Sequence, residues 1–126
     1  MKSRLIYWLT YAGMWLLALL PFRALYVLSD GFCFLMHYIV NYRRKVVRNN
    51  LHNAFPEKSE AELREIECKF YRYICDYMLE EVKMLRMSFK ELCRRMEYDN
   101  KEEYLAMIEK HGGIVLVIPH YANFEW

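Results

Sequence analysis

The chain has 126 residues, which is enough for one small domain, and 56% of them are hydrophobic. Residues 1–56 carry seven Lys or Arg and one Asp, whereas residues 57–126 carry eleven Lys or Arg and fifteen Asp or Glu. This asymmetry is typical of a membrane anchor followed by a water-facing domain. It argues against nucleic-acid binding, because no basic stripe continues past residue 56. The four cysteines form no CxxC pair and no histidine stands at zinc spacing, so neither a metal nor a cofactor is predicted.

The N-terminal segment is predicted to be a membrane anchor over residues 1–23. Between Arg4 and Arg23 lie eighteen uncharged residues, and a span needs about 20. Trp8 and Tyr11 belong to residue types that are common at headgroup depth. Because no small-residue cleavage site follows the apolar run, an uncleaved anchor is favoured over a signal peptide.

Residues 24–56 are predicted to form an interfacial helix and a basic linker. Asp30 lies near the middle of the apolar stretch 24–42, and a carboxylate at the centre of a bilayer is costly, so a second span is disfavoured. The helix is expected to lie at the membrane interface or against a catalytic domain. His37 within it is predicted to be a packing residue rather than a ligand.

A basic cluster follows this helix and is predicted to contact the membrane. Each cation near an anionic surface contributes about 1 kcal/mol of attraction. An ordinary solvated helix end is the alternative interpretation. Positive charge after the anchor favours a cytoplasmic location for the rest of the chain. The cluster comprises Arg43, Arg44, Lys45 and Arg48.

A long helix is predicted to start after Ser59, because Ser59 and Glu62 form a capping-box pattern, and to reach about Arg86. Glu81 falls on its apolar face, where a carboxylate needs a partner. A buried ion pair is the favoured interpretation, and support of an active site is the alternative. The predicted apolar face comprises Leu63, Ile66, Phe70, Tyr73, Ile74, Tyr77, Met78, Val82 and Leu85.

Two shorter helices and a strand are predicted after residue 87. Ser88 and Asn100 each precede a glutamate at capping-box spacing, and the second helix is expected to turn Tyr104, Leu105 and Ile108 inward. The pair Gly112-Gly113 ends that helix, since glycine accepts a positive φ. The run 114–118 is continuously apolar and rich in β-branched residues, which is the pattern of a strand buried on both faces of a parallel sheet.

Chemistry-bearing side chains follow the predicted strand directly. In parallel sheets, ligands sit beyond the carboxyl ends of the strands, and His120 and Glu125 stand there at H-x4-E spacing. In a strand–loop–helix turn the carboxylate can fix the imidazole tautomer, which leaves the other ring nitrogen to take a proton from a hydroxyl. A surface loop with an ordinary His and Glu is the alternative.

The segment Gly112–Val117, followed by His120-Tyr121-x-Asn123-Phe124-Glu125-Trp126, resembles the first motif of the lipid A biosynthesis acyltransferase family. This family, of lauroyl and myristoyl type, belongs to the lysophospholipid acyltransferase-like superfamily. The stretch Arg48–Pro56 is similar to that family's segment between the anchor and the first long helix. Members usually have glycine where Ala122 stands. The resemblance covers nearly all of this chain, but only the first half or less of a typical member.

This resemblance implies transfer of a fatty acyl group from an acyl carrier protein thioester to a hydroxyl of a lipid A precursor. The reaction would take place at the cytoplasmic face of the bacterial inner membrane. His120 would be the general base, Glu125 its orienter, and Asn123 and Phe124 would shape the substrate site. The implied fold of the whole enzyme is α/β, of the glycerolipid acyltransferase-like type, with residues 57–126 as the first part of the catalytic domain. This chain itself is expected to be mainly α, with the anchor and one C-terminal strand.

Two other functions remain open at this point. The chain could be a non-catalytic, membrane-anchored helical protein, or it could belong to an acyltransferase that modifies a different membrane lipid. Because a single strand has no sheet to join, we expect the 126 residues to be a fragment, a truncated product or a domain that needs a partner. Alone they are expected to be inactive.

Overall fold

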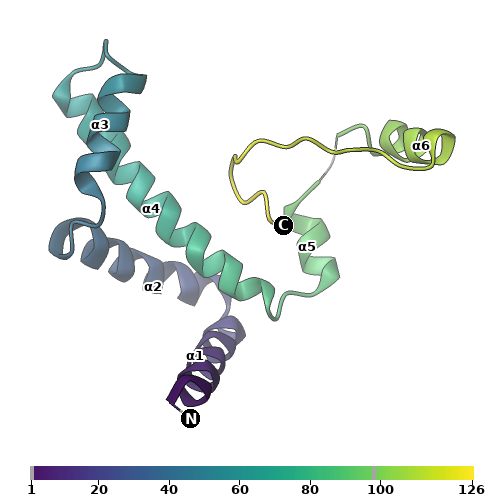
Figure 1. Cartoon of the computed structure of the whole chain (residues 1–126), viewed down its shortest axis with the longest axis horizontal. Helices are drawn as coiled ribbons and strands as arrows, with labels where there is room; N and C mark the ends of the chain where they lie inside the picture. Colours follow the sequence, from purple (N-terminus) through teal and green to yellow (C-terminus); the bar gives the residue numbers. More distant parts are fainter. Residues whose placement is uncertain (1, 98) are drawn as a thin grey trace. The chain divides into compact units, whose positions relative to one another are not determined.

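The computed structural model describes residues 2–97 and 99–126, and these are mainly helical, as predicted (Figure 1). They divide into two compact units, one ending at Leu85 and the other beginning at Arg86, and each unit is described by itself. The division into an anchor (residues 1–23), a linker segment (24–56) and the first part of a catalytic domain (57–126) describes functional roles, and it stays a prediction. The helices are α1 Lys2–Leu19, α2 Phe22–Phe34, η1 Leu35–Ile39 (a π-helical turn), α3 Arg44–Ala54, α4 Glu60–Met84, α5 Phe89–Arg95 and α6 Lys101–His111.

Helix α4 begins with the predicted capping box. The Glu62 backbone N–H donates to Ser59 Oγ at 3.4 Å, and the Ser59 N–H donates to the Glu62 carboxylate at 2.9 Å. Both groups would otherwise be unpaired at the start of the helix. The helix ends at Met84, two residues before the predicted end at Arg86.

Helix α4 is the element against which α1, α2, η1 and α3 pack. Lys83 near its C-terminal end donates to the carbonyl oxygens of Ala18 (2.8 Å) and Leu20 (2.7 Å), so it satisfies acceptors left open where α1 ends. The Tyr26 hydroxyl of α2 donates to the Glu80 carboxylate at 2.7 Å. These bonds attach the first two helices to α4.

The buried face of α4 agrees with the predicted one only in part. Its buried residues are Leu63, Glu67, Tyr71 and Cys75, which follow one another at four-residue steps. Leu63 was predicted to be buried, whereas Phe70, Tyr73 and Met78 of the predicted face are 39–47% exposed. The prediction was wrong for these three residues because it counted only apolar side chains, whereas a carboxylate with partners occupies the centre of the buried strip.

The chain bends sharply between α2 and α3. The π-helical turn η1 ends α2, and Asn41 (φ 53°) and Arg43 (φ 50°) then adopt left-handed backbone conformations, which cost energy in residues other than glycine. Among the described residues, no single helix has the length and hydropathy of a membrane span. Phe22–Ile39 and Arg44–Ala54, bent by 90°, meet these criteria only when taken together.

The two short helices of the second unit begin close to where they were predicted. Ser88 Oγ accepts the Glu91 backbone N–H at 3.2 Å and so caps α5, while Asn100 precedes α6 without a side-chain cap. Gly112 ends α6 with φ 75°, as predicted. Leu105 is 51% exposed, so the prediction that it points inward was wrong.

The predicted strand at residues 114–118 is absent: the described residues contain no β-strand, and this run is irregular and exposed. Val115 and Val117 are 91% and 88% exposed. Sheet formation requires a neighbouring strand to take up the backbone N–H and C=O groups, and no such partner exists in the described part of the chain. The apolar pattern indicates that residues 114–118 suit a buried strand, but a strand forms only where a neighbouring strand is present.

Candidate functional site

The histidine of the H-x4-E motif lies in the loop after residue 118. His120 is exposed, and its ring stacks on Phe124 with a centroid separation of 4.3 Å and an interplanar angle of 5°. Glu125 is also exposed, and no hydrogen bond or ion pair joins it to His120 among the described residues. The role of Glu125 as orienter therefore stays a prediction.

The backbone of this loop turns tightly around the motif. The Tyr121 N–H donates to the Pro119 carbonyl at 2.8 Å, and the Trp126 N–H donates to the Asn123 carbonyl at 3.4 Å. Ala122 between them has φ 52°, in the left-handed region that favours glycine. This is the position at which the family resemblance leads one to expect glycine.

The end of the motif lies against α5 within the second unit. Asn123, Phe124 and Trp126 are half-buried, and the Arg95 guanidinium lies 5.5 Å from the Trp126 ring, close enough for a cation–π contact. A cavity of about 500 Å³ borders this contact. Its lining comprises Phe89, Leu92, Cys93, Met96, Glu97, Lys101 and Trp126.

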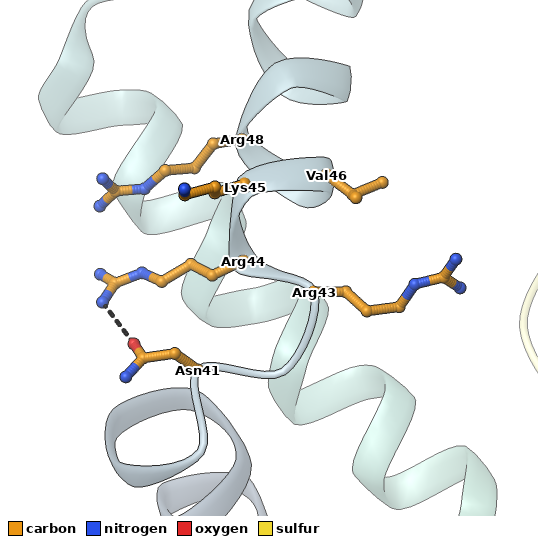
Figure 2. Close-up of a pocket in the computed structure, with 6 residues that line it drawn as sticks. All are labelled: Asn41, Arg43, Arg44, Lys45, Val46 and Arg48. Atoms are coloured by element: carbon orange, nitrogen blue, oxygen red, sulfur yellow. Dashed lines mark hydrogen bonds between the residues drawn. The ribbon is translucent and has the colours of Figure 1, made fainter.

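The basic cluster at residues 43–48 divides into two sets (Figure 2). Arg44 and Arg48 extend to one side of α3, while Arg43 extends to the opposite side. Arg44 and Arg48 donate through their Nε atoms to the two carboxylate oxygens of Glu67, at 2.7 and 3.0 Å. Contact of the whole cluster with a membrane stays a prediction, but two of its cations already have a protein partner.

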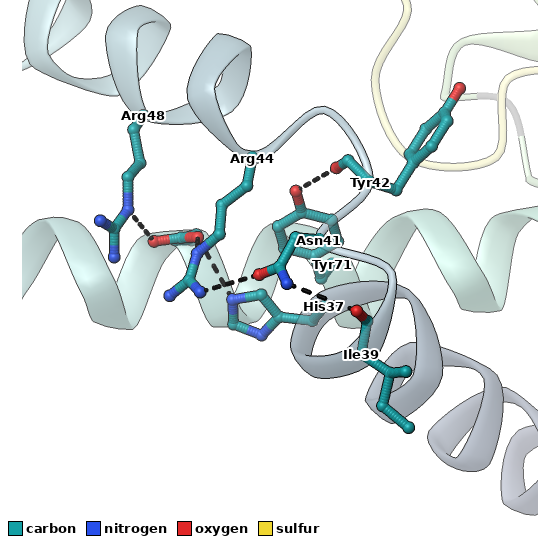
Figure 3. Close-up of polar contacts among 8 residues, drawn as sticks. His37, Ile39, Asn41, Tyr42, Arg44, Arg48 and Tyr71 are labelled. Carbon is teal, nitrogen blue, oxygen red and sulfur yellow. Dashed lines mark hydrogen bonds and ion pairs between the residues drawn. The ribbon is translucent and has the colours of Figure 1, made fainter.

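Glu67 is the centre of a buried polar network that was not predicted from the sequence (Figure 3). The residue is 1% exposed, and His37 Nε2 lies 3.2 Å from its Oε1 atom. Burial raises the pKa of Glu67, but hydrogen bonds from Arg48, Arg44 and His37 outweigh it and leave that pKa below its usual range. Glu67 is therefore an ionised carboxylate in the interior.

Tyr71 connects this network to the bend of the chain. Its ring stacks on His37 with a centroid separation of 4.5 Å, and its hydroxyl donates to the carbonyl oxygen of Tyr42. His37 is thus a buried packing residue, as predicted, but it also contacts the carboxylate. The sequence signal for this network was a four-residue spacing, which places side chains on one face of a helix. It occurs in α3 between Arg44 and Arg48, and in α4 between Leu63, Glu67 and Tyr71.

No group of three or more metal-binding side chains lies together among the described residues. His120 with its neighbours is the candidate for chemistry, and the basic bend is the candidate for binding.

Comparison with known proteins assigns the chain to a family. The family described as "Bacterial lipid A biosynthesis acyltransferase" matches residues 1–126. The chain is 30% identical over 122 residues to the lipid A biosynthesis lauroyltransferase of Escherichia coli (strain K12), an alignment that covers 94% of this chain and 40% of that protein. No solved structure matches. The chain therefore belongs to the bacterial lipid A biosynthesis acyltransferase family, of whose curated relative it spans about 40% of the length.

Proposed function

We propose that the enzyme containing this segment transfers a fatty acyl group from an acyl carrier protein thioester to a hydroxyl of a lipid A precursor. His120 removes the proton of the acceptor hydroxyl, and the resulting oxygen attacks the thioester carbonyl carbon. The tetrahedral intermediate collapses, the carbon–sulfur bond breaks, and the imidazolium returns its proton to the leaving thiol. Glu125 orients His120, while Asn123 and Phe124 shape the substrate site.

Family membership over the whole chain is the observation that supports this proposal most strongly. The exposed position of His120 is compatible with access of a substrate hydroxyl, and stacking on Phe124 restricts rotation of the imidazole ring. An imidazole ring that is already held in one orientation loses less rotational freedom when it reaches the reactive geometry, which favours catalysis.

The proposed reaction is tested with the intact enzyme that carries this segment. Purified enzyme is incubated with a lipid A precursor and either an acyl–acyl carrier protein or the corresponding acyl–coenzyme A. We expect the lipid to gain the mass of one acyl group, with the carrier-protein thioester as the better donor. Acylation of another membrane lipid in preference to the lipid A precursor would contradict the acceptor assignment but leave the reaction class intact.

We propose that residues 1–23 hold the enzyme on the cytoplasmic face of the bacterial inner membrane. Large apolar side chains of α1 are extensively exposed, which is unfavourable in water and favourable in lipid. The most exposed, at 60–65%, are Leu5, Ile6, Tyr7, Trp8, Leu9 and Leu16.

Deletion of residues 1–23 is expected to move the enzyme out of the carbonate-washed membrane fraction. The deletion also removes the carbonyl groups that Lys83 binds, so misfolding has to be separated from loss of anchoring. A chimera that carries an unrelated transmembrane helix in place of residues 1–17 retains those carbonyls and should return to the membrane. If the deletion variant is folded and still sediments with carbonate-washed membranes, residues 1–23 are not the anchor.

A further inference from the structure

Glu67 holds two guanidinium groups in a fixed arrangement at the bend. Arg44 and Arg48 both bind this carboxylate through Nε, on the inner edge of the guanidinium. Of the outer nitrogens, only Arg44 Nη1 has a partner among the described residues, namely Asn41 Oδ1 at 3.1 Å. The two side chains are 33% and 44% exposed, so their remaining N–H groups are accessible from solvent.

Lys45 adds a third cation to this side of α3. Figure 2 shows Arg44, Lys45 and Arg48 extending to the same side of the helix, opposite to Arg43. Lys45 is exposed, and no described residue pairs with it. Three cations and one carboxylate leave this group with two uncompensated positive charges. A cavity of about 480 Å³ lies at the bend, and all three cations line it together with Asn41, Arg43 and Val46.

Such an arrangement matches the chemistry of a phosphate group. Guanidinium groups bind phosphate oxygens through paired, charge-assisted hydrogen bonds, and a lysine adds a mobile donor. Repulsion would normally separate two arginines, but the shared carboxylate keeps them together before any ligand arrives, which lowers the cost of binding. We propose that Arg44, Lys45 and Arg48 form a phosphate-binding site at the bend between η1 and α3.

The surroundings of the site favour a lipid headgroup as the source of the phosphate. Tyr38, Ile39, Val40 and Tyr42, which precede the site in the chain, are 50–62% exposed. Aromatic and aliphatic side chains beside cations are typical of surfaces that lie at the boundary between headgroups and acyl chains. The site deepens the proposed membrane association and rests on it. Its binding assay measures neither acyl transfer nor anchoring by residues 1–23, so either proposal can fail without the other.

A matched pair of single-charge variants tests the site. Lys45→Gln removes an exposed cation that lines the cavity, and Lys90→Gln removes an exposed cation of α5 that does not. Neither residue contacts Glu67, so both variants should keep the helical signal and melting temperature of the wild type. The whole chain is kept in micelles of an uncharged detergent, so that residues 1–23 are embedded in every sample, and binding of a water-soluble short-chain phosphatidic acid is measured by calorimetry. We expect Lys45→Gln to weaken binding about tenfold, corresponding to one lost charge-assisted hydrogen bond of about 1.4 kcal/mol, and Lys90→Gln to leave it nearly unchanged.

Two further measurements identify what the site recognises. Inorganic phosphate added at constant ionic strength should compete with the phosphatidic acid, whereas chloride should not. If phosphate alone also gives a binding signal in calorimetry, free phosphate is a second source of the same ligand chemistry. A short-chain lipid that carries a carboxylate in place of the phosphate should bind more weakly. Equal affinity for both lipids, or equal losses in Lys45→Gln and Lys90→Gln, would overturn the proposal, because diffuse charge attraction would then suffice.

Discussion

Replacement of His120 by alanine in the intact enzyme is expected to lower the rate of acyl transfer by roughly 10²–10⁴-fold, the contribution typical of general-base catalysis. Alanine cannot accept the hydroxyl proton, so the acceptor would have to attack the thioester as a neutral alcohol. His120 is exposed and contributes to no buried core, so the variant should fold like the wild type. Single-turnover measurement of acyl transfer, together with circular dichroism of the variant, checks both expectations.

His111→Ala is the matched control for this experiment. His111 is also exposed and lies at the end of α6, nine residues before His120, so the chemical change is the same at a position without a proposed role. Activity of His120→Ala close to that of His111→Ala would refute the assignment of the base.

Glu125→Gln tests the orienter separately. It should lower the rate less than His120→Ala and should change the pH profile of the rate, because an amide does not stabilise a protonated imidazole as a carboxylate does.

Local sequence signals predicted the helix boundaries well. The capping box of Ser59 and Glu62, the serine cap at Ser88 and the glycine at residue 112 each act within one turn of chain, so their effect does not depend on distant residues. The predicted strand at residues 114–118 failed for the opposite reason. Strand formation depends on backbone groups elsewhere in the molecule, and the described residues supply none.

Packing of α4 could be predicted only in part. Periodicity identified a long amphipathic helix, but apolar residues occur around most of its circumference, so several orientations fit the pattern almost equally. The actual orientation places the acidic residue Glu67 inside, because Arg44, Arg48 and His37 converge on it from other elements. Glu81, which the sequence pattern placed on the buried face, is half-buried, and its Oε1 atom is shielded from solvent. The periodicity of a single helix carries no information about partners that lie 19 to 30 residues away in other elements.

The chemistry of the loop was easier to locate than its geometry. The spacing of His120 and Glu125 identified the candidate site, and the family comparison agrees with the reaction class. The stacking of His120 on Phe124 and the left-handed conformation of Ala122 depend on the path of the loop, which the residue types alone do not determine.

The bend between α2 and α3 is expected to depend on Glu67 more than on any other polar residue of the first unit. Glu67→Gln keeps the volume of the side chain but leaves two guanidinium groups side by side without their carboxylate. Loss of one partner from a buried pair costs several kcal/mol, and we expect ~3 kcal/mol here, the low end of the range, because the arginines are partly exposed. Thermal unfolding of the detergent-solubilised chain, followed by circular dichroism, measures the effect. Glu65→Gln on the same helix is the control, since its pair with Lys69 is exposed on both sides and should contribute little.

The pH dependence of the unfolding free energy distinguishes an ion-pair role of Glu67 from a role in packing alone. The pKa of Glu67 is lowered in the folded state, so its ionised form stabilises the fold above the unfolded value of about 4.3, and this contribution is lost as pH falls through the lower folded value. The difference in unfolding free energy between the wild type and Glu67→Gln should therefore be constant near neutral pH and should shrink below about pH 4. A packing defect alone would leave that difference independent of pH. A constant difference down to the acid limit, or equal effects of Glu67→Gln and Glu65→Gln, would show that the carboxylate is not what holds the bend together.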